Sequence, residues 1–216
     1  MKGDPIKAKV LSVQKIPNAE PGILKALKVP KGYRSLGIIT TDIDDISYAA
    51  LDDATKKANV IVAYAHSMYA GSSNASTKLA GEFIGILAGF DPEEVKSGLD
   101  AAISYIENDA FFFCADDDGD VPYFAQCISK TGVYLSKKAG IKEGTSMAYL
   151  IAPPNEAICG LDEALKMADV EMKVFYGPPT ETNFAGGLLT GDQAACKAAC
   201  KAFADTVIRI ADMPIE

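Results

Sequence analysis

Three carboxylates in the first half of the chain could hold a small cation. Asp44 and Asp45 stand where a helix is expected to begin, and Glu82 opens a glycine-rich apolar run. One acid at a helix start is explained by capping, because a short side chain there can accept a backbone N–H. The second acid is not needed for that role. Clustered acids could bind an organic ammonium by charge-assisted hydrogen bonds, although spacing alone favours a solvated acidic helix start.

The remaining residues offer little catalytic or metal-binding chemistry. His66 is the only histidine, so a nucleophile–histidine relay would have to pass through it, and a two-histidine metal site is impossible within one chain. We expect it in an exposed loop over residues 66–78. The acidic run 116–120 predicts a turn rather than a calcium loop, because calcium spacing would make Cys114 and Ala125 ligands.

The five cysteines all lie in the second half and have no paired zinc spacing, so we expect reduced thiols rather than disulfides or metal ligands. They are Cys114, Cys127, Cys159, Cys196 and Cys200.

An internal repeat predicts the helices and strands that position the three carboxylates. The segment from Leu51 to Val60 returns 110 residues later as the segment from Leu161 to Val170, with six of ten residues identical. Both copies sit in the order strand, helix, strand, glycine-rich strand, helix. Self-similarity at half the chain length indicates one domain duplicated and fused, and we expect domains over residues 1–107 and 108–216.

Hydrophobic periodicity and turn residues predict the individual elements. Asp91 and Pro92 mark a helix start, and Asp192 caps the last helix. A helix over residues 123–139 is expected to end at Gly140. The expected strands cover residues 6–14, 36–40, 61–65, 81–90, 111–114, 148–152, 171–176 and 185–191. The other expected helices cover residues 24–29, 41–58, 91–108 and the repeated segment after Asn155.

The two halves differ at the repeated helix start. At the 110-residue spacing, Asp44 and Asp45 correspond to Pro154 and Asn155. Asp45 and Asn155 can both cap a helix, which leaves one acid of the first half without a structural role. The acidic cluster is therefore expected in the first half only.

Composition excludes two classes of partner. The 216-residue chain is 49% hydrophobic and carries a formal net charge of -8, without a Lys/Arg stripe that could neutralise phosphates. We therefore expect no nucleic-acid partner. No apolar run approaches the length that crosses a bilayer, so we expect no membrane partner either.

Several segments carry a family resemblance. The alanine-rich helix ending in Ala-x-x-Ala-(Asn/Asp)-Val and the glycine-rich strand ending in Gly-Asp resemble the bacterial microcompartment shell domain. Two copies in one chain resemble the tandem-domain shell proteins of ethanolamine utilisation, and the likeness covers nearly the whole chain. The segments that carry it are residues 34–37, 67–71, 148–154, 181–184 and 190–200.

The resemblance implies a fold, an assembly and a place in the cell. Each half would be a circularly permuted shell domain, an α/β sandwich. Three chains would form a pseudo-hexameric disc with a central pore and smaller pores within each subunit. The disc would tile with other shell proteins into the shell of an ethanolamine-degrading microcompartment in the cytoplasm. It would be a structural protein without catalytic residues, cofactor or metal.

The resemblance also implies a ligand, ethanolamine, at the smaller pores. Matching positions would make Asp44, Asp45, Glu82 and Phe112 ligands, with Thr182, Asn183 and Phe184 as further contributors. Three consecutive phenylalanines at 111–113 leave the register of Phe112 open. The chemistry agrees, because carboxylates match the ammonium group and the Asn183 side chain or a backbone amide suits the hydroxyl.

Two alternatives differ in kind from a shell protein. One is a small-amine lyase or hydrolase using Glu82 as general base, against which the scarce histidines and missing cofactor motifs count. The other is a soluble amine-binding sensor that shares the domain. A stable monomer would favour the sensor, and a trimer without turnover would favour the shell protein.

Overall fold

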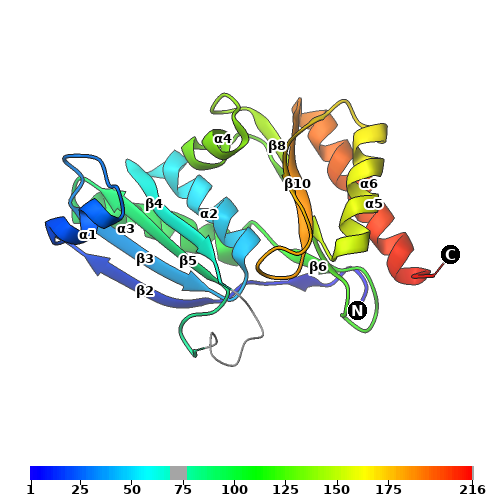
Figure 1. Ribbon diagram of the computed structural model, residues 1–216, viewed down its shortest axis with the longest axis horizontal. Helices are drawn as coiled ribbons and strands as arrows, with labels where there is room; N and C mark the ends of the chain where they lie inside the picture. Colours follow the sequence, from blue (N-terminus) through cyan, green and yellow to red (C-terminus); the bar gives the residue numbers. More distant parts are fainter. Residues whose placement is uncertain (69–76, 216) are drawn as a thin grey trace. The chain divides into compact units, whose positions relative to one another are not determined.

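The computed structural model describes residues 1–68 and 77–215 and contains two compact units, each a sheet covered by helices (Figure 1). We name them by the repeat that supplies most of each. The N-unit comprises Ala8–Ala110 and Gly132–Leu135. The C-unit comprises Met1–Lys7, Phe111–Thr131 and Ser136–Glu216.

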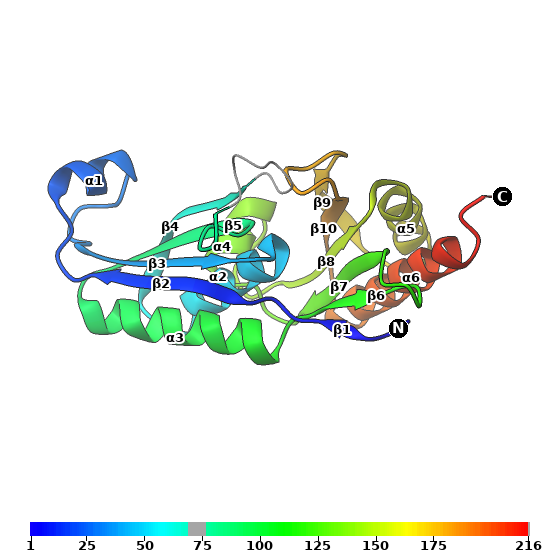
Figure 2. The same cartoon turned by 90° about the horizontal axis from the view of Figure 1, so that it is seen from below.

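The N-unit is built on a four-stranded antiparallel sheet in the order β2-β3-β5-β4. Two long helices pack against this sheet and each other, and Figure 2 shows α3 running along one face. The strands are β2 Val10–Ile16, β3 Ser35–Thr41, β4 Val60–Ser67 and β5 Phe83–Gly89. The helices are α1 Pro21–Ala26, α2 Asp44–Lys57 and α3 Pro92–Asn108.

The C-unit repeats this plan with two more strands, in the sheet order β1-β6-β7-β8-β10-β9. Its helices α5 and α6 lie side by side (Figure 1). The strands are β1 Pro5–Ile6, β6 Phe112–Cys114, β7 Pro122–Ile128, β8 Ser146–Ala152, β9 Glu171–Tyr176 and β10 Ala185–Gly191. The helices are α5 Pro154–Met167 and α6 Gln193–Asp212, together with α4 Val133–Ala139, whose first three residues belong to the N-unit.

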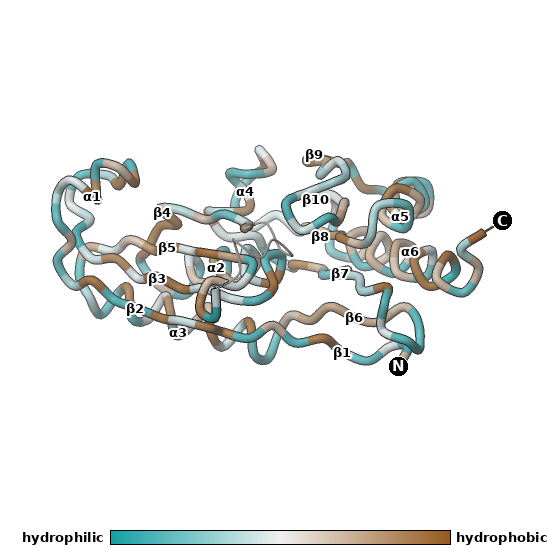
Figure 3. The backbone as a smooth tube through the Cα atoms, turned by 60° about the horizontal axis from the view of Figure 1, so that its bottom comes forward, coloured by the Kyte–Doolittle hydropathy of each residue, from teal (hydrophilic) through white to brown (hydrophobic). Residues whose placement is uncertain are grey.

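Amphipathic helices and small residues hold each unit together. Along α6 the backbone alternates between hydrophobic and hydrophilic colours in Figure 3, and its buried residues recur every three or four positions. Gly160 of α5 lies against the buried ring of Phe203 on α6, where an added Cβ would approach the ring to 2.7 Å. Glycine therefore sets the spacing of this helix pair.

The predicted order of elements is confirmed in both halves. Helices α2 and α5 each span 14 residues and begin 110 residues apart, at Asp44 and Pro154. The caps at Asp91 and Asp192 are also confirmed, because their side chains accept backbone N–H groups of the first turns of α3 and α6. Gly140 ends α4 with a φ of +63°, as its position after the helix predicted.

Several predictions about local structure are wrong. The single strand expected over residues 6–14 is two strands, β1 and β2, which belong to different sheets. The helix over 123–139 is two elements, because β7 pairs with β8 over residues 124–128 and a helix begins only at Val133. Sheet pairing with buried Phe124 outweighs local helix preference there. His66 is exposed as expected, but it lies in β4 rather than in a loop. Ser67 of the expected loop also lies in β4. Residues 69–76 of that loop, which include residues 69–71 of the resembling segments, fall outside the described ranges.

Another error concerns the starts of the repeated helix. Neither Asp45 nor Asn155 caps its helix, because α2 begins at Asp44 and α5 at Pro154, which puts Ile43 and Pro153 in the capping positions. Neither of these preceding residues makes a side-chain cap hydrogen bond. Asp45 is thus inside the first turn, so capping explains neither acid of the first half.

Candidate functional site

Strand register brings the three predicted acids to one end of the N-unit sheet. Phe83 of β5 pairs with both Thr41 at the end of β3 and Ser67 at the end of β4. The adjacent Glu82 donates its N–H to the Thr41 carbonyl at 2.9 Å and accepts the Met68 N–H at 2.7 Å. Its backbone is therefore fixed between two strand ends, near the point where β3 leads into α2.

Asp44 and Asp45 form the first turn of α2 and are buried rather than solvated. Their exposed fractions are 6% and 7%. The Asp45 N–H donates to Asp44 Oδ1 at 2.8 Å, and the first turn of a helix favours negative charge. Burial of both acids argues against a merely solvated helix start, since buried carboxylates are costly without a compensating partner.

A hydroxyl pair supports Asp44 from the neighbouring strand. Ser67 hydrogen-bonds to the Asp44 carboxylate, and its Oγ lies 2.9 Å from the Tyr48 hydroxyl. Burial raises the pKa of Asp44, and the Ser67 hydrogen bond opposes that rise. Tyr48 is held in turn by an edge-to-face contact with Phe83, ring centroids 4.8 Å apart. Sequence reasoning did not identify Ser67 or Tyr48.

Glu82 titrates near neutrality. Partial burial, followed by the charges of Asp44 and Asp42, raises the pKa of Glu82 to about 7. Carboxylates close enough to raise each other's pKa repel each other when all are ionised. A bound cation would relieve that repulsion, so this end of the N-unit is suited to a positively charged ligand.

Four predicted site residues lie in the C-unit. Phe112 of β6 is buried and stacks on Phe124 with ring centroids 5.2 Å apart. It meets Phe184 edge-on at 6.1 Å. Phe111 and Phe113 are only half-buried, so Phe112 is the inward-facing ring of the triplet.

Thr182 and Asn183 lie in a tight turn of the loop between β9 and β10. The Thr180 carbonyl accepts the Asn183 N–H at 3.0 Å, and Asn183 adopts a φ of +66°. The Thr180 hydroxyl accepts the Phe184 N–H at 3.1 Å and lies 3.4 Å from the Thr182 hydroxyl. Thr182 is buried and Asn183 is exposed. That these C-unit residues share one ligand with the three acids remains a prediction.

Comparison with known proteins decides the family. The BMC domain model matches residues 35–113. The chain is 58% identical over 215 residues to the bacterial microcompartment shell protein EutL of Clostridium perfringens, covering 100% of this chain and 99% of the relative. The chain belongs to the EutL family of bacterial microcompartment shell proteins. EutL of Escherichia coli is 48% identical over 213 residues, covering 99% and 97% of the two chains.

A solved structure extends the likeness to three dimensions. The crystal structure of EutL from Leptotrichia buccalis superposes on this EutL-family chain with a TM-score of 0.98, at 62% identity and 100% coverage of both chains. The chain is thus a component of a microcompartment shell with two BMC domains in tandem. Its relatives are structural shell proteins, so the alternative of an enzyme using Glu82 as base is set aside.

The other sequence features of this EutL-family chain that could bind a metal ion or react chemically gain no support from the structure. Asp116 Oδ1 accepts the N–H groups of Gly119 and Asp120, so the acidic run forms a turn stabilised by its own backbone. Residues 1–68 and 77–215 hold no cluster of three His, Cys, Asp or Glu side chains arranged for a metal ion. All five cysteines are free thiols. In the same described ranges, no helix has the length and apolarity needed to cross a membrane.

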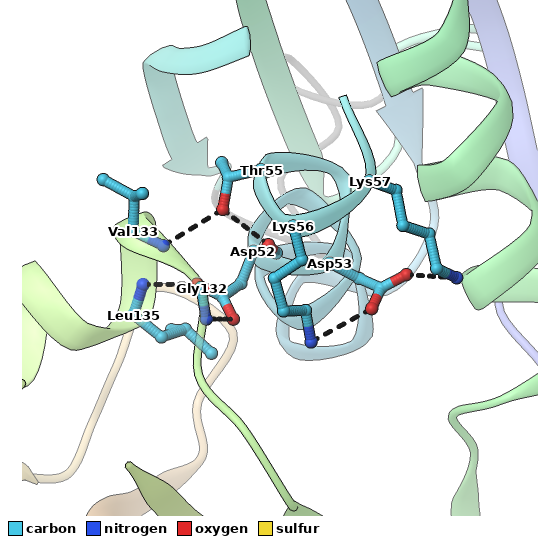
Figure 4. A network of polar contacts seen from close by, with 8 residues as sticks. All are labelled: Asp52, Asp53, Thr55, Lys56, Lys57, Gly132, Val133 and Leu135. Atoms are coloured by element: carbon cyan, nitrogen blue, oxygen red, sulfur yellow. Dashed lines mark hydrogen bonds and ion pairs between the residues drawn. The ribbon is translucent and has the colours of Figure 1, made fainter. Parts of the chain in front are cut away.

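A buried polar network on α2 was not anticipated (Figure 4). Asp52 is fully buried, and its two carboxylate oxygens accept the N–H groups of Gly132 at 2.6 Å and Leu135 at 2.8 Å. Beside it, the Thr55 hydroxyl accepts the Val133 N–H at 3.1 Å. A side chain of α2 thereby caps the first turn of α4, a role that spacing along the chain cannot reveal.

Proposed function

We propose that this shell protein assembles as a homotrimeric, pseudo-hexameric disc with a central pore and smaller pores within each subunit. In this proposal it belongs to an ethanolamine-utilisation compartment, tiles beside other shell proteins, and binds ethanolamine at the acidic set of the N-unit. The observation that carries the ligand proposal is the burial of Asp44 and Asp45 beside Glu82. Membership of the EutL family supports the assembly.

The acids suit the ammonium end of ethanolamine. An ammonium has three N–H donors, and ionised carboxylates are acceptors for such donors. Binding would replace repulsion between Asp44 and Glu82 by attraction to a shared cation. Acidic groups that line a passage also favour cations over anions, so the same residues would tune what passes through a smaller pore.

The hydroxyl group of ethanolamine needs an uncharged hydrogen-bond donor or acceptor. The Asn183 side chain offers both kinds of group and is exposed in its turn. Phe112, Thr182 and Phe184 would supply an apolar and hydroxyl-bearing wall around the two carbons. We include these four C-unit residues in the proposed site because the family resemblance implies them.

Calorimetric titration of ethanolamine tests the ligand. Loss of a charge-assisted hydrogen bond is worth about 1.5–3 kcal/mol, so Asp45→Asn and Glu82→Gln should each weaken binding about 10- to 150-fold. Asp116→Asn is the matched control, because that acid accepts backbone N–H groups of its own turn. 1-Propanol, which lacks the ammonium, should not bind. Unchanged affinity in both site variants would refute the site assignment.

Sedimentation of the wild-type protein tests the assembly separately. A trimer is expected with or without ethanolamine. A stable monomer that still binds ethanolamine would favour an amine-binding sensor instead.

A further inference from the structure

A groove of about 510 Å³ lies between helices α5 and α6 of the C-unit. All the residues that line it belong to these two helices, so the C-unit alone forms the groove. Its lining includes the apolar side chains of Met167, Ala198 and Ala202 and the carboxylate-bearing side chain of Glu163. Sites for small molecules are about 300–1,000 Å³ in volume, so the groove is large enough to hold one.

The repeat identifies the equivalent positions in the N-unit. Helices α2 and α5 correspond at a spacing of 110 residues, since they begin at Asp44 and Pro154. Helices α3 and α6 correspond at a spacing of 101 residues, since Asp91 and Asp192 cap them. At this second spacing the six buried residues of α3 coincide with the six buried residues of α6. The two helix pairs can therefore be compared position by position.

In the N-unit, a ring and an ammonium group occupy positions that line the groove in the C-unit. Tyr105 of α3 is buried, with 8% of its surface exposed. On α2, the ammonium of Lys57 lies 2.7 Å from the carboxylate of Asp53. In the C-unit, the counterparts of these three residues are Thr206, Met167 and Glu163, and all three line the groove.

The C-unit keeps the carboxylate but lacks the ring and the ammonium. Threonine is smaller than tyrosine, and Met167 carries no charge. Thr206 is 5% exposed and lines the groove, and its hydroxyl makes no hydrogen bond within residues 1–68 and 77–215. In the same part of the chain Glu163 forms no ion pair, and the nearby Lys166 pairs with Asp162. The groove therefore offers an acceptor for a cation and space beside a buried hydroxyl.

We propose that this groove binds an arylalkylammonium compound, which supplies the ring and the ammonium that the N-unit provides from its own side chains. The ammonium pairs with Glu163 as Lys57 pairs with Asp53, and the ring lies against Ala202 beside Thr206. The site is separate from the acids of the N-unit. It depends on neither ethanolamine binding nor the trimer.

The charges along the groove favour an ammonium at Glu163. Lys201 pairs with Asp205 on the same helix, so these two charges offset each other. Arg209 also lines a neighbouring hollow together with Cys159, which stands one turn before Glu163 on α5. A ligand whose cation contacts Glu163 thus gains a charge-assisted hydrogen bond while its charge stays on the side away from this guanidinium.

Fluorine NMR titration with 4-fluorophenethylamine tests the site on the whole protein. This probe carries a ring and an ammonium, so its resonance should shift and broaden saturably as protein is added. 2-(4-Fluorophenyl)ethanol has the same ring and no charge. It should bind about tenfold more weakly or not at all, because it cannot form the charge-assisted hydrogen bond. Excess ethanolamine should not displace the probe, because it has no ring to hold it in the groove.

Two variants that alter the carboxylate or its neighbour should each weaken probe binding about tenfold. Glu163→Gln removes the acceptor for the ammonium. Met167→Lys places a lysine four residues after Glu163, where it pairs with that carboxylate as Lys57 pairs with Asp53 and competes with the probe. Circular dichroism checks that both variants are folded.

Thr206→Tyr tests the space for the ring. The tyrosine restores the residue type found at the matching position 105, so its side chain should fill the groove and abolish probe binding. Met167 is 66% exposed, so Met167→Lys keeps the site testable if Thr206→Tyr does not fold.

Matched controls make the same changes on β9, outside the groove. Glu171→Gln removes an acid that pairs with Lys173. Met172→Lys adds a lysine at a methionine that is 38% exposed. Both variants should bind the probe as the wild type does.

The outcomes decide between this groove and other places where the probe could bind. Weakened binding in Glu163→Gln and Met167→Lys, with both controls unchanged, supports the groove. Equal affinity in all four variants overturns the proposal, as does a wild-type protein without saturable binding. Binding that Glu82→Gln abolishes and Glu163→Gln leaves unchanged also overturns it, because the probe would then occupy the acids of the N-unit.

Discussion

Removing the Asp52 side chain should destabilise the N-unit, because this side chain is the hydrogen-bond acceptor for two buried residues. Asp52→Ala leaves the N–H groups of Gly132 and Leu135 without their acceptor, and both residues are buried. Each such orphaned group costs about 1–3 kcal/mol. Part of this loss is offset because a desolvated carboxylate is also removed. We therefore expect a net loss of about 3 kcal/mol in the free energy of unfolding.

Thermal and urea unfolding measure this loss. For chains of 150–250 residues, 1 kcal/mol shifts the melting temperature by about 2–4 °C, so Asp52→Ala should lower it by about 6–12 °C. Asp162→Ala is a control supplied by the repeat itself. It makes the same change at the equivalent position, where the side chain is 61% exposed and pairs with Lys166 of the same helix. The control should leave the melting temperature unchanged, because exposed ion pairs contribute little.

Two results would contradict the reasoning. Equal shifts in Asp52→Ala and Asp162→Ala would show that the carboxylate of Asp52 has no special role. A loss below about 1 kcal/mol would show that water or a rearranged first turn of α4 replaces both hydrogen bonds.

Three further predictions concern titration, packing and thiol reactivity. Ethanolamine affinity should rise from about pH 6 to pH 8, because Glu82, whose pKa is about 7, loses its proton over this range while an aliphatic ammonium stays charged. Glu82→Gln should flatten this pH profile, which calorimetry measures. Gly160→Ala should lower stability in urea by about 1–3 kcal/mol, although alanine is the better helix former, because its Cβ would press on Phe203; a stabilised variant would show that the ring can move. Cys159, exposed on α5, should react first with a thiol reagent in the native protein, and Cys159→Ser should abolish the fast phase; a fast phase that persists would mean that another thiol opens readily.

The repeated architecture was accessible from sequence because the duplication preserved the helix that covers each sheet. Ten aligned residues placed α2 and α5 in register, and glycine-rich runs located β5 and β10. Short polar residues located the helix starts at Asp91 and Asp192, since capping is a local interaction. These features depend on neighbours within a few positions along the chain.

The features that sequence missed depend on distant partners. The carboxylate of Asp52 meets backbone groups 80 and 83 residues away, and nothing local distinguishes it from the equivalent exposed Asp162. The burial of Asp44 and the part played by Ser67 follow from where two strands end around β5. Residues 123–128 fit a helix locally, but their pairing with β8 makes them a strand.

The unequal starts of α2 and α5 have a consequence for any ring built from this chain. When six identical single-domain chains form a ring, every substitution appears six times around it. Fusion of two copies frees alternate positions, so acids can stand at the first turn of α2 while proline and asparagine occupy that turn in α5. In a ring of three such chains, three helix starts would carry the two acids and the other three would carry proline and asparagine.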